Sequence, residues 1–328
     1  MSMYLSFYGL ERSPFGPTAD PDFLYLTHGH REALAQLTYA IQERKGFMLL
    51  TAEVGTGKTT LLEALRRRLD GNTAVAYVSN SMLPFAGILE YMLEDFEIVK
   101  PGESHAQRLV TLQNFLVERH RAGQSTVLIL DEAQNLYPQT LEQVRLLSNF
   151  ETTKEKILQI LLVGQPELRA KLEMPELRQL NQRIAMRCTI PPLTRAGTRN
   201  YIRSRLQAAG ARDPGIFTDP ALERIAECAG GIPRVVNTLC DHCLLIGYAD
   251  QVRRISAGMV DEAVSYLEAG RQPRRRGRAR ARMRFMTPVR WALLGIVSAL
   301  AAGIGSLAVT RPDAVAQILD MGRAYLGQ

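Results

Sequence analysis

A glycine-containing turn, EVGTG at residues 53–57, separates a short apolar run from a segment with helical periodicity. The apolar run is GFMLLTA at 46–52, and the periodic segment, KTTLLEALRRRL, covers 58–69. A strand, a glycine turn and a Lys-Thr pair that opens a helix make up a phosphate-binding loop, or P-loop. Such a loop directs backbone N–H groups and a helix N-terminus at one point, which suits the negative charge of a triphosphate. The sequence therefore predicts an α/β P-loop fold that binds ATP.

The residues of this loop have distinct expected roles. Gly55 and Gly57 let the backbone approach the phosphates closely, because glycine has no Cβ. Lys58 is expected to reach the β- and γ-phosphates, and the Thr59 hydroxyl to ligate Mg²⁺. Ala52 stands where the usual motif has its first glycine, and it is small enough for binding to survive. The residues expected to bind the nucleotide are Glu53, Val54, Gly55, Thr56, Gly57, Lys58, Thr59 and Thr60.

A second part of the site is expected about 70 residues after the P-loop, at TVLILDEAQNL, residues 126–136. An apolar run that ends in two acids is typical of a buried parallel strand with carboxylates at its carboxyl end. Asp131 is expected to hold Mg²⁺ through water. Glu132 is expected to polarise the attacking water as general base. Together with the P-loop, this motif predicts Mg-ATP hydrolysis.

The order of elements predicts a five-stranded parallel sheet with crossing helices, followed by an all-helical segment at 195–268. A large α/β domain with a small helical lid is the layout of AAA+ ATPases. The expected strands are 47–52, 73–78, 126–131, 158–163 and 186–190, and the expected helices between them are 84–95, 105–121, 139–150 and 175–183.

Residues 291–309, WALLGIVSALAAGIGSLAV, contain no charge over nineteen residues. A helix of that length reaches about 28 Å, close to the roughly 30 Å of a bilayer's hydrocarbon core. Eight Arg in the fourteen residues before it, 271–284, place its N-terminal side in the cytoplasm. We therefore expect one transmembrane helix at 289–310; the alternative is a buried Ala-rich core helix.

The positive charge of the chain lies almost entirely in this C-terminal part. Residues 271–328 carry eleven Arg and two acids, a net +9, so the overall charge of +7 leaves −2 on residues 1–270. An anionic lipid surface is the expected partner of the Arg run; a solvated linker and a nucleic-acid patch are the alternatives. The slightly acidic body makes nucleic acid an unlikely partner.

Several long stretches resemble the general secretion pathway protein A (ExeA-type) ATPases, from the N-terminus through about residue 268. They are YGLERSPFGPTADPDFLYLTHGHREAL at 8–34, EVGTGKTTL at 53–61, LDEAQNL at 130–136, VRLLSNFET at 144–152, LLVGQPEL at 161–168, LRQLNQRI at 177–184, PPLT at 191–194 and GIPRVVNTLCD at 231–241.

This resemblance implies an inner-membrane, cytosol-facing ATPase that works with an envelope partner in a secretion, pilus or polysaccharide-export machine. Full-length members continue into a periplasmic peptidoglycan-binding domain, so a short form without that domain is expected here. The expected organisation is an N-terminal segment with an adenine-side helix at 1–45, an ATPase core at 46–192, a helical lid at 193–270, an Arg-rich linker at 271–288, a membrane helix at 289–310 and a short periplasmic tail at 311–328.

The AAA+ layout implies further site residues. Gln165, after the fourth strand, is expected to order water near the γ-phosphate (sensor 1); a turn residue that caps the next helix is the alternative. Arg234 in the lid is expected to contact the γ-phosphate (sensor 2); the alternative is an ordinary surface Arg. Arg183 is expected to act in trans on a neighbour's site in a homo-oligomer, with Arg178 and Arg187 as the other possibilities.

The segment 8–32 is expected to surround the adenine and ribose, with Pro14, Phe15, Tyr25 and His30 as its contacts; ordinary packing is the alternative. Two functions of other classes compete with a motor ATPase. One is a DNA-associated AAA+ protein of the transposition type, and the other is a slow nucleotide-gated scaffold.

Overall fold

The computed structural model describes residues 4–16, 23, 25–69, 71–79, 82–152 and 155–271. The expected Arg-rich linker beyond Arg271, the membrane helix at 289–310 and the tail at 311–328 lie outside these residues. Within the described part of the chain, no helix is long and apolar enough to cross a membrane. Residues 1–271 form one compact unit by their internal contacts.

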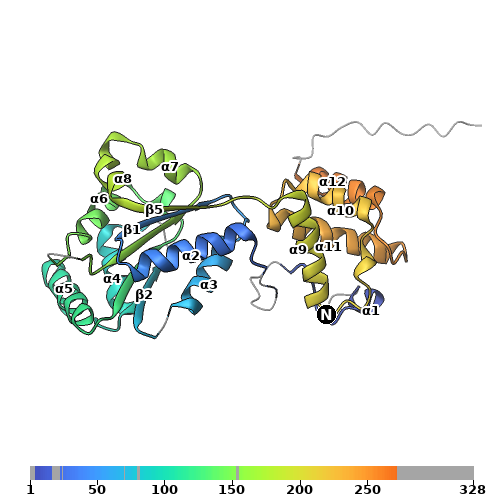
Figure 1. Cartoon of the computed structure of the whole chain (residues 1–328). Helices are drawn as coiled ribbons and strands as arrows, with labels where there is room; N and C mark the ends of the chain where they lie inside the picture. Colours follow the sequence, from blue (N-terminus) through green and yellow to red (C-terminus); the bar gives the residue numbers. More distant parts are fainter. Residues whose placement is uncertain are drawn as a thin grey trace, which may run out of the picture. The chain divides into compact units, whose positions relative to one another are not determined.

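Five parallel strands form a single sheet in the order β2-β3-β4-β1-β5. Figure 1 labels β1, β2 and β5 of this sheet. This confirms the predicted five-stranded parallel sheet, and each strand agrees with its expected range to within two residues at either end. The order of the strands places β1 and β3 on either side of β4, which the sequence did not indicate. The strands are β1 Phe47–Ala52, β2 Thr73–Val78, β3 Ser125–Leu130, β4 Gln159–Gly164 and β5 Ile184–Ile190.

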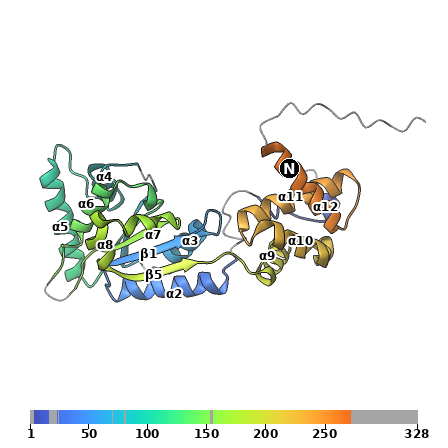
Figure 2. The ribbon, with the colours of Figure 1, turned by 90° about the horizontal axis from the view of Figure 1, so that it is seen from above.

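The central strands are buried on both faces, so their sequences are continuous apolar runs rather than alternating ones. Because successive side chains point to opposite faces, Phe47 and Leu49 of β1 belong to a core with α4 to α8. Met48 and Leu50 belong to a second core with α2 and α3 on the other face. Figure 2 shows α2 on one side of the sheet and α6, α7 and α8 on the other. The sheet is therefore a three-layer α/β/α core.

The helices of this core are α2 His28–Gln42, α3 Lys58–Arg68, α4 Phe85–Asp95, α5 His105–Arg121, α6 Pro138–Leu147, α7 Glu167–Leu172 and α8 Arg178–Arg183, with 3₁₀ turns η2 Ala133–Asn135 and η3 Pro175–Leu177. Local sequence explains several of their starts. Ser104 and Gln107 form a capping box at the start of α5, and Pro138 occupies the first turn of α6. The expected helix at 175–183 begins instead as the 3₁₀ turn η3.

A second, all-helical core follows β5 and is called the lid below. Its helices are α9 Arg195–Ala208, η4 Pro214–Ile216, α10 Asp219–Ala229, α11 Pro233–Ala249 and α12 Ala257–Arg271. Its apolar centre also contains residues from the N-terminal segment around α1 Leu5–Tyr8, namely Tyr4, Tyr8, Leu10, Phe15 and Phe23. The sequence grouped residues 1–45 as one segment, whereas the structure divides them between the lid core and, through α2, the sheet core.

A close backbone contact joins the start of the lid to the turn before α11. The Leu193 N–H donates to the Gly231 carbonyl at 2.8 Å. Gly231 has φ +75°, and a Cβ built on it would lie 2.1 Å from the Leu193 carbonyl oxygen. Only glycine fits here, because the atom in the way belongs to the backbone and cannot rotate aside.

We expect Gly231→Ala to lower the free energy of unfolding by about 3 kcal/mol or more, from the positive φ and the clash together. The neighbouring Gly230 is a matched control, since it also has a positive φ, +56°, but nothing within 4 Å of its added Cβ. Gly230→Ala should therefore cost only about 1 kcal/mol. Urea unfolding of both variants measures the difference, and equal losses would contradict the steric explanation.

Candidate functional site

The turn between β1 and α3 has the backbone geometry of an anion site. Gly55 and Gly57 have φ +82° and +108°, and Gly57 caps the N-terminus of α3. The Thr56 hydroxyl donates to the Glu53 carbonyl at 2.8 Å, which closes the turn. The N–H groups of the first turn of α3 are therefore directed into the cavity that the loop borders.

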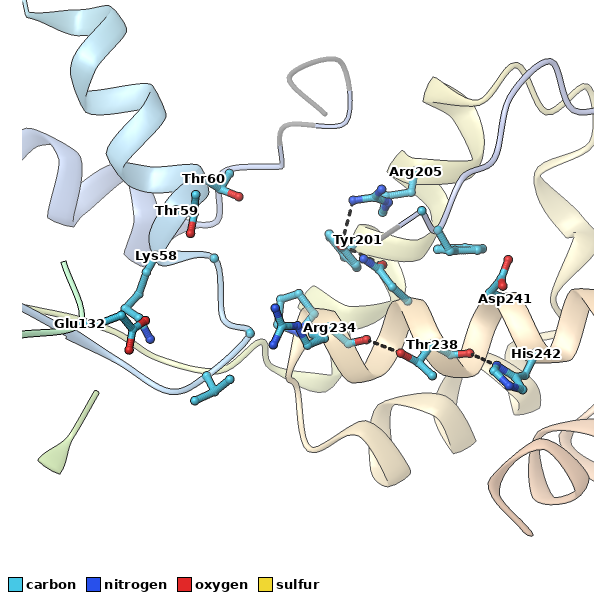
Figure 3. A pocket seen from close by; sticks show the side chains of 17 residues that line it. Lys58, Thr59, Thr60, Glu132, Tyr201, Arg205, Arg234, Thr238, Asp241 and His242 are labelled. Carbon is cyan, nitrogen blue, oxygen red and sulfur yellow. Dashed lines mark hydrogen bonds between the residues drawn. The ribbon is translucent and has the colours of Figure 1, made fainter. Parts of the chain in front are cut away.

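Lys58 stands at the first position of α3, and its side chain curls back over this loop. Its Nζ donates to the carbonyls of Ala52 at 3.0 Å and Glu53 at 3.4 Å, and the side chain is largely buried. Thr59 and Thr60 follow it on the same helix and border the same cavity (Figure 3). A cation and two hydroxyl-bearing residues thus border the cavity at the N-terminus of α3.

Asp131 and Glu132 follow β3 directly, at the edge of the sheet where β1 also ends. Asp131 is 8 % exposed, and its carboxylate accepts from the Tyr77 hydroxyl at 2.8 Å and from the Glu132 N–H at 2.8 Å. Burial, and then the hydrogen bond to Asp131, raises the pKa of Tyr77, so the phenol stays a donor. The sequence did not indicate a role for Tyr77, because its place beside Asp131 depends on the pairing of β2 with β3.

Glu132 adopts a left-handed backbone conformation, φ 51° and ψ 35°, which is uncommon for a residue with a side chain. Such outliers gather at functional sites, where the surrounding structure holds them in place. Its Oε2 accepts from Gln134 Nε2 at 2.6 Å and from Gln165 Nε2 at 3.1 Å. Burial alone would raise the pKa of Glu132, but these hydrogen bonds and the charge of Lys58 outweigh it and lower the pKa. The carboxylate is therefore ionised and ready to accept a proton.

The cavity at this edge has a volume of about 730 Å³, within the usual range for small-molecule sites. Figure 3 shows its lid side, with Arg234, Thr238, Asp241 and His242 along one helix. The residues that line it come from the N-terminal segment, the P-loop, the turn after β3 and the lid. They are Phe15, Gly16, Val54, Gly55, Gly57, Lys58, Thr59, Thr60, Glu132, Tyr201, Arg205, Pro233, Arg234, Asn237, Thr238, Asp241 and His242.

The donor set fits Mg²⁺ that arrives with a triphosphate. Mg²⁺ is normally held by one or two carboxylates together with substrate phosphates, rather than by a dedicated cage of protein ligands. Asp131 and Thr59 supply one carboxylate and one hydroxyl beside the loop. Among the described residues, no group of three or more His, Cys, Asp or Glu side chains is placed to hold a metal ion by itself.

Comparison with known proteins identifies the family. The AAA domain family matches residues 41–172. General secretion pathway protein A of Aeromonas hydrophila is 41% identical over 262 residues, which make up 80% of this chain and 48% of that protein. The chain belongs to the AAA+ family of general secretion pathway protein A. It spans about half the length of this relative.

Solved structures share the AAA+ fold at low sequence identity. Cdc6p from Pyrobaculum aerophilum superposes with a TM-score of 0.59 at 18% identity, over 77% of this chain and 70% of that one. The ORC2 protein of Aeropyrum pernix, solved as ADPNP–ADP complexes, gives 0.56 at 20% identity, over 80% and 73%. These similarities support the predicted α/β P-loop fold with a helical C-terminal part.

Within this AAA+ fold, the structure brings Gln165 and Arg234 to the P-loop site. Gln165 follows β4 and contacts Glu132, as described above. The Arg234 N–H donates to the Gly55 carbonyl at 3.2 Å, and Arg234 Cβ lies 2.7 Å from a Cβ built on Gly55. A side chain at Gly55 would therefore collide with the lid helix α11.

Arg183 lies at the opposite edge of the sheet from this site. It precedes Ile184, which pairs with Phe47 at the start of β1, whereas the P-loop follows the end of β1. The two ends of the six-residue strand β1 are five residue steps apart, roughly 16 Å at about 3.3 Å per step. Arg183 donates to Ser148 Oγ at 2.7 Å and Asn149 Oδ1 at 2.9 Å. It therefore has no access to its own P-loop.

The two other candidates for a role in trans are Arg187, which pairs with Leu49 in the middle of β1, and Arg178. Arg187 is part of β5, where it donates to the side chain and carbonyl of Asn181. Arg178 begins α8 and is exposed.

The N-terminal segment contributes to the site at several points. Phe15 lines the cavity, and the Pro14 carbonyl accepts from the buried Arg205. Tyr25 packs its ring edge-on against Tyr201, which also lines the cavity. His30 is 3 % exposed and lies under the loop, where a Cβ on Gly57 would be 2.8 Å from its Nε2. The sequence singled out these positions, but not Arg205, Tyr201 or Asn237.

Burial lowers the pKa of His30 below its usual 6.5, and this outweighs the opposing hydrogen bond with the Thr56 backbone. The unfolded chain therefore binds more protons near pH 6, so stability is lost as the pH falls through the folded pKa. We expect His30→Gln to reduce the loss of stability that occurs as the pH falls. The substitution should therefore lower the free energy of unfolding more at pH 7.5 than at pH 5. Urea unfolding across that range measures it, with exposed His28→Gln as control; parallel curves for all three proteins would contradict the prediction.

Proposed function

We propose that this chain hydrolyses Mg-ATP and that its lid responds to the nucleotide. The convergence of Lys58, Asp131, Glu132 and Gln165 at one end of the sheet supports this proposal. Phosphate binding alone requires only the loop and its lysine. An ionised, hydrogen-bonded glutamate beside the loop adds a group that can accept a proton from water.

The residues divide the work of the reaction. The loop N–H groups and Lys58 bind the β- and γ-phosphates. Thr59 and Asp131 would hold Mg²⁺, which would supply positive charge against the phosphates. Glu132 takes a proton from the attacking water, and Gln165 keeps its carboxylate in place. The aromatic side chains of Phe15, Tyr25 and Tyr201 flank the adenine ring of ATP.

Arg234 links the nucleotide to the lid. Its guanidinium contacts the γ-phosphate, and its backbone already contacts Gly55 of the loop. Loss of the γ-phosphate removes one of the two contacts, and the lid then has fewer interactions with the sheet core. Hydrolysis therefore changes the position of the lid.

We further propose that the chain is anchored in the bacterial inner membrane by residues 289–310, with the ATPase part in the cytoplasm. The charge-free run and the Arg residues before it support this topology. The similarity to general secretion pathway protein A supports an envelope assembly partner. The lid ends at Arg271, immediately before the Arg-rich stretch, so a lid movement would be transmitted towards the membrane.

The first test is ATP turnover by wild type and Glu132→Gln over a series of protein concentrations, with particle size from light scattering. We expect wild-type specific activity to rise as the protein oligomerises, and Glu132→Gln to bind ATP but lose about 10²–10⁴-fold in rate. Exposed Glu118→Gln on α5 is the control. ATP binding without turnover in the wild type would favour the nucleotide-gated scaffold instead.

Arg183 gives a second test, because an arginine that acts on a neighbour can be supplied by another copy. Arg183→Ala should lose about 10³-fold in rate or more while ATP binding is retained. Mixing it with Glu132→Gln should restore turnover. The Glu132→Gln subunit still has Arg183, which can reach the site of a neighbouring Arg183→Ala subunit where Glu132 is intact. Arg121→Ala, at the exposed C-terminal end of α5, is the control. Absence of recovery in the mixture would assign Arg183 a purely structural role through Ser148 and Asn149.

A further inference from the structure

The side chain of Gln134 lies between the two turns that carry Glu132 and Gln165. Its Nε2 donates to Glu132 Oε2 at 2.6 Å, and its Oε1 accepts from the Gln165 N–H at 3.1 Å. Gln165 in turn donates from Nε2 to the same oxygen of Glu132 at 3.1 Å. The amide of Gln134 is thus satisfied at both ends, and two donors converge on one carboxylate oxygen. Such an arrangement fixes the orientation of the carboxylate.

The last residue of β4 leaves the space that this amide occupies. A Cβ built on Gly164 would lie 2.6 Å from Gln134 Oε1 and 2.8 Å from Leu168 Cδ2. Gly164 does not have a positive φ, so conformational freedom does not explain the glycine. It is buried in a fully buried strand, where glycine weakens pairing and packing. The close approach of the Gln134 amide and of the Leu168 side chain accounts for a glycine at this position.

A lysine holds the backbone on the far side of Gln134. Lys171, on α7, donates from Nζ to the carbonyls of Gln134 at 2.5 Å and Leu136 at 2.7 Å. The short turn η2 is therefore tied to α7 through its backbone and to Gln165 through the Gln134 side chain. Gln165 and Lys171 both belong to the segment that follows β4, so both contacts join η2 to that one segment.

We propose that Gln134 is a positioning residue for Glu132, that Gly164 provides its space and that Lys171 anchors its turn. This inference rests on the proposed function, in which Glu132 accepts a proton from the attacking water. Gln134 itself does not border the cavity, whereas Glu132 does. It therefore acts on the reaction through the orientation of Glu132 and leaves nucleotide binding to the loop.

The test separates turnover from binding. In Gln134→Ala, kcat for ATP should fall roughly 10- to 100-fold, because a misplaced catalytic group loses rate steeply. The KM for ATP and the Kd of a fluorescent ATP analogue should change less than about threefold, since the P-loop is intact. Gln134→Glu keeps the shape but sets a second carboxylate against Glu132, and should lose at least as much. The control is Gln139→Ala, an exposed glutamine of α6.

A substitution at Gly164 tests whether the position of the Gln134 amide matters, because it displaces the amide without removing it. Gly164→Ala should reproduce the loss of kcat seen for Gln134→Ala, with ATP-analogue binding retained. In the double variant the second substitution should add less than about twofold, because the alanine methyl then meets only the Leu168 side chain and no amide. Gly71→Ala, with nothing within 4 Å of its added Cβ, is the matched control.

The outcomes distinguish the two proposals. Wild-type turnover that Gln134→Ala leaves unchanged would overturn the positioning role while the proposed function stands. Additive losses in the double variant, or a parallel loss of analogue binding, would overturn it as well. A wild-type protein that binds ATP without any turnover would overturn the proposed function, and this inference with it.

Discussion

The pairing of β4 between β1 and β3 is the constraint on which the site depends. In a parallel sheet all carboxyl ends lie at one edge, and ligands bind outside that edge. Thr51 of β1 lies beside Gly164 of β4, and Leu130 of β3 lies beside Leu162 of β4. The P-loop, Gln165 and the acid pair are therefore neighbours although the chain separates them widely. Strand register brings these segments together, and hydrogen bonds such as that from Gln165 to Glu132 then join their side chains.

This edge of the sheet contains unfavourable local geometry that the core compensates. Glu132 has a left-handed backbone, and Gly164 stands in a buried strand, where glycine generally weakens pairing and packing. Such features persist where the surroundings determine them strongly. Here β1 and β4 are buried along their whole length between two apolar layers. The rigid sheet therefore permits a glutamate and two amides to be held in one arrangement.

The lid and the N-terminal segment share one core, which affects how the nucleotide is enclosed. Tyr4 and Tyr8 pack among the lid helices, and the same segment continues past Phe15 at the cavity towards α2 and His30 under the P-loop. The lid is therefore connected to the sheet core along two stretches of chain, this one and the one after β5. A movement of the lid would displace cavity residues of both stretches together.

The sequence by itself determined the strands, the P-loop, the acid pair and the existence of a helical lid. These features depend on local periodicity and on residues close together in the chain, such as Lys58 after Gly57 or Glu132 after Asp131. Tertiary structure alone decided the strand order, the contact of Tyr77 with Asp131, the bridge by Gln134 and the space left by Gly164. It also divided the first 45 residues between two cores. Those features depend on the register between distant segments, and periodicity within one segment carries no information about its neighbours in space.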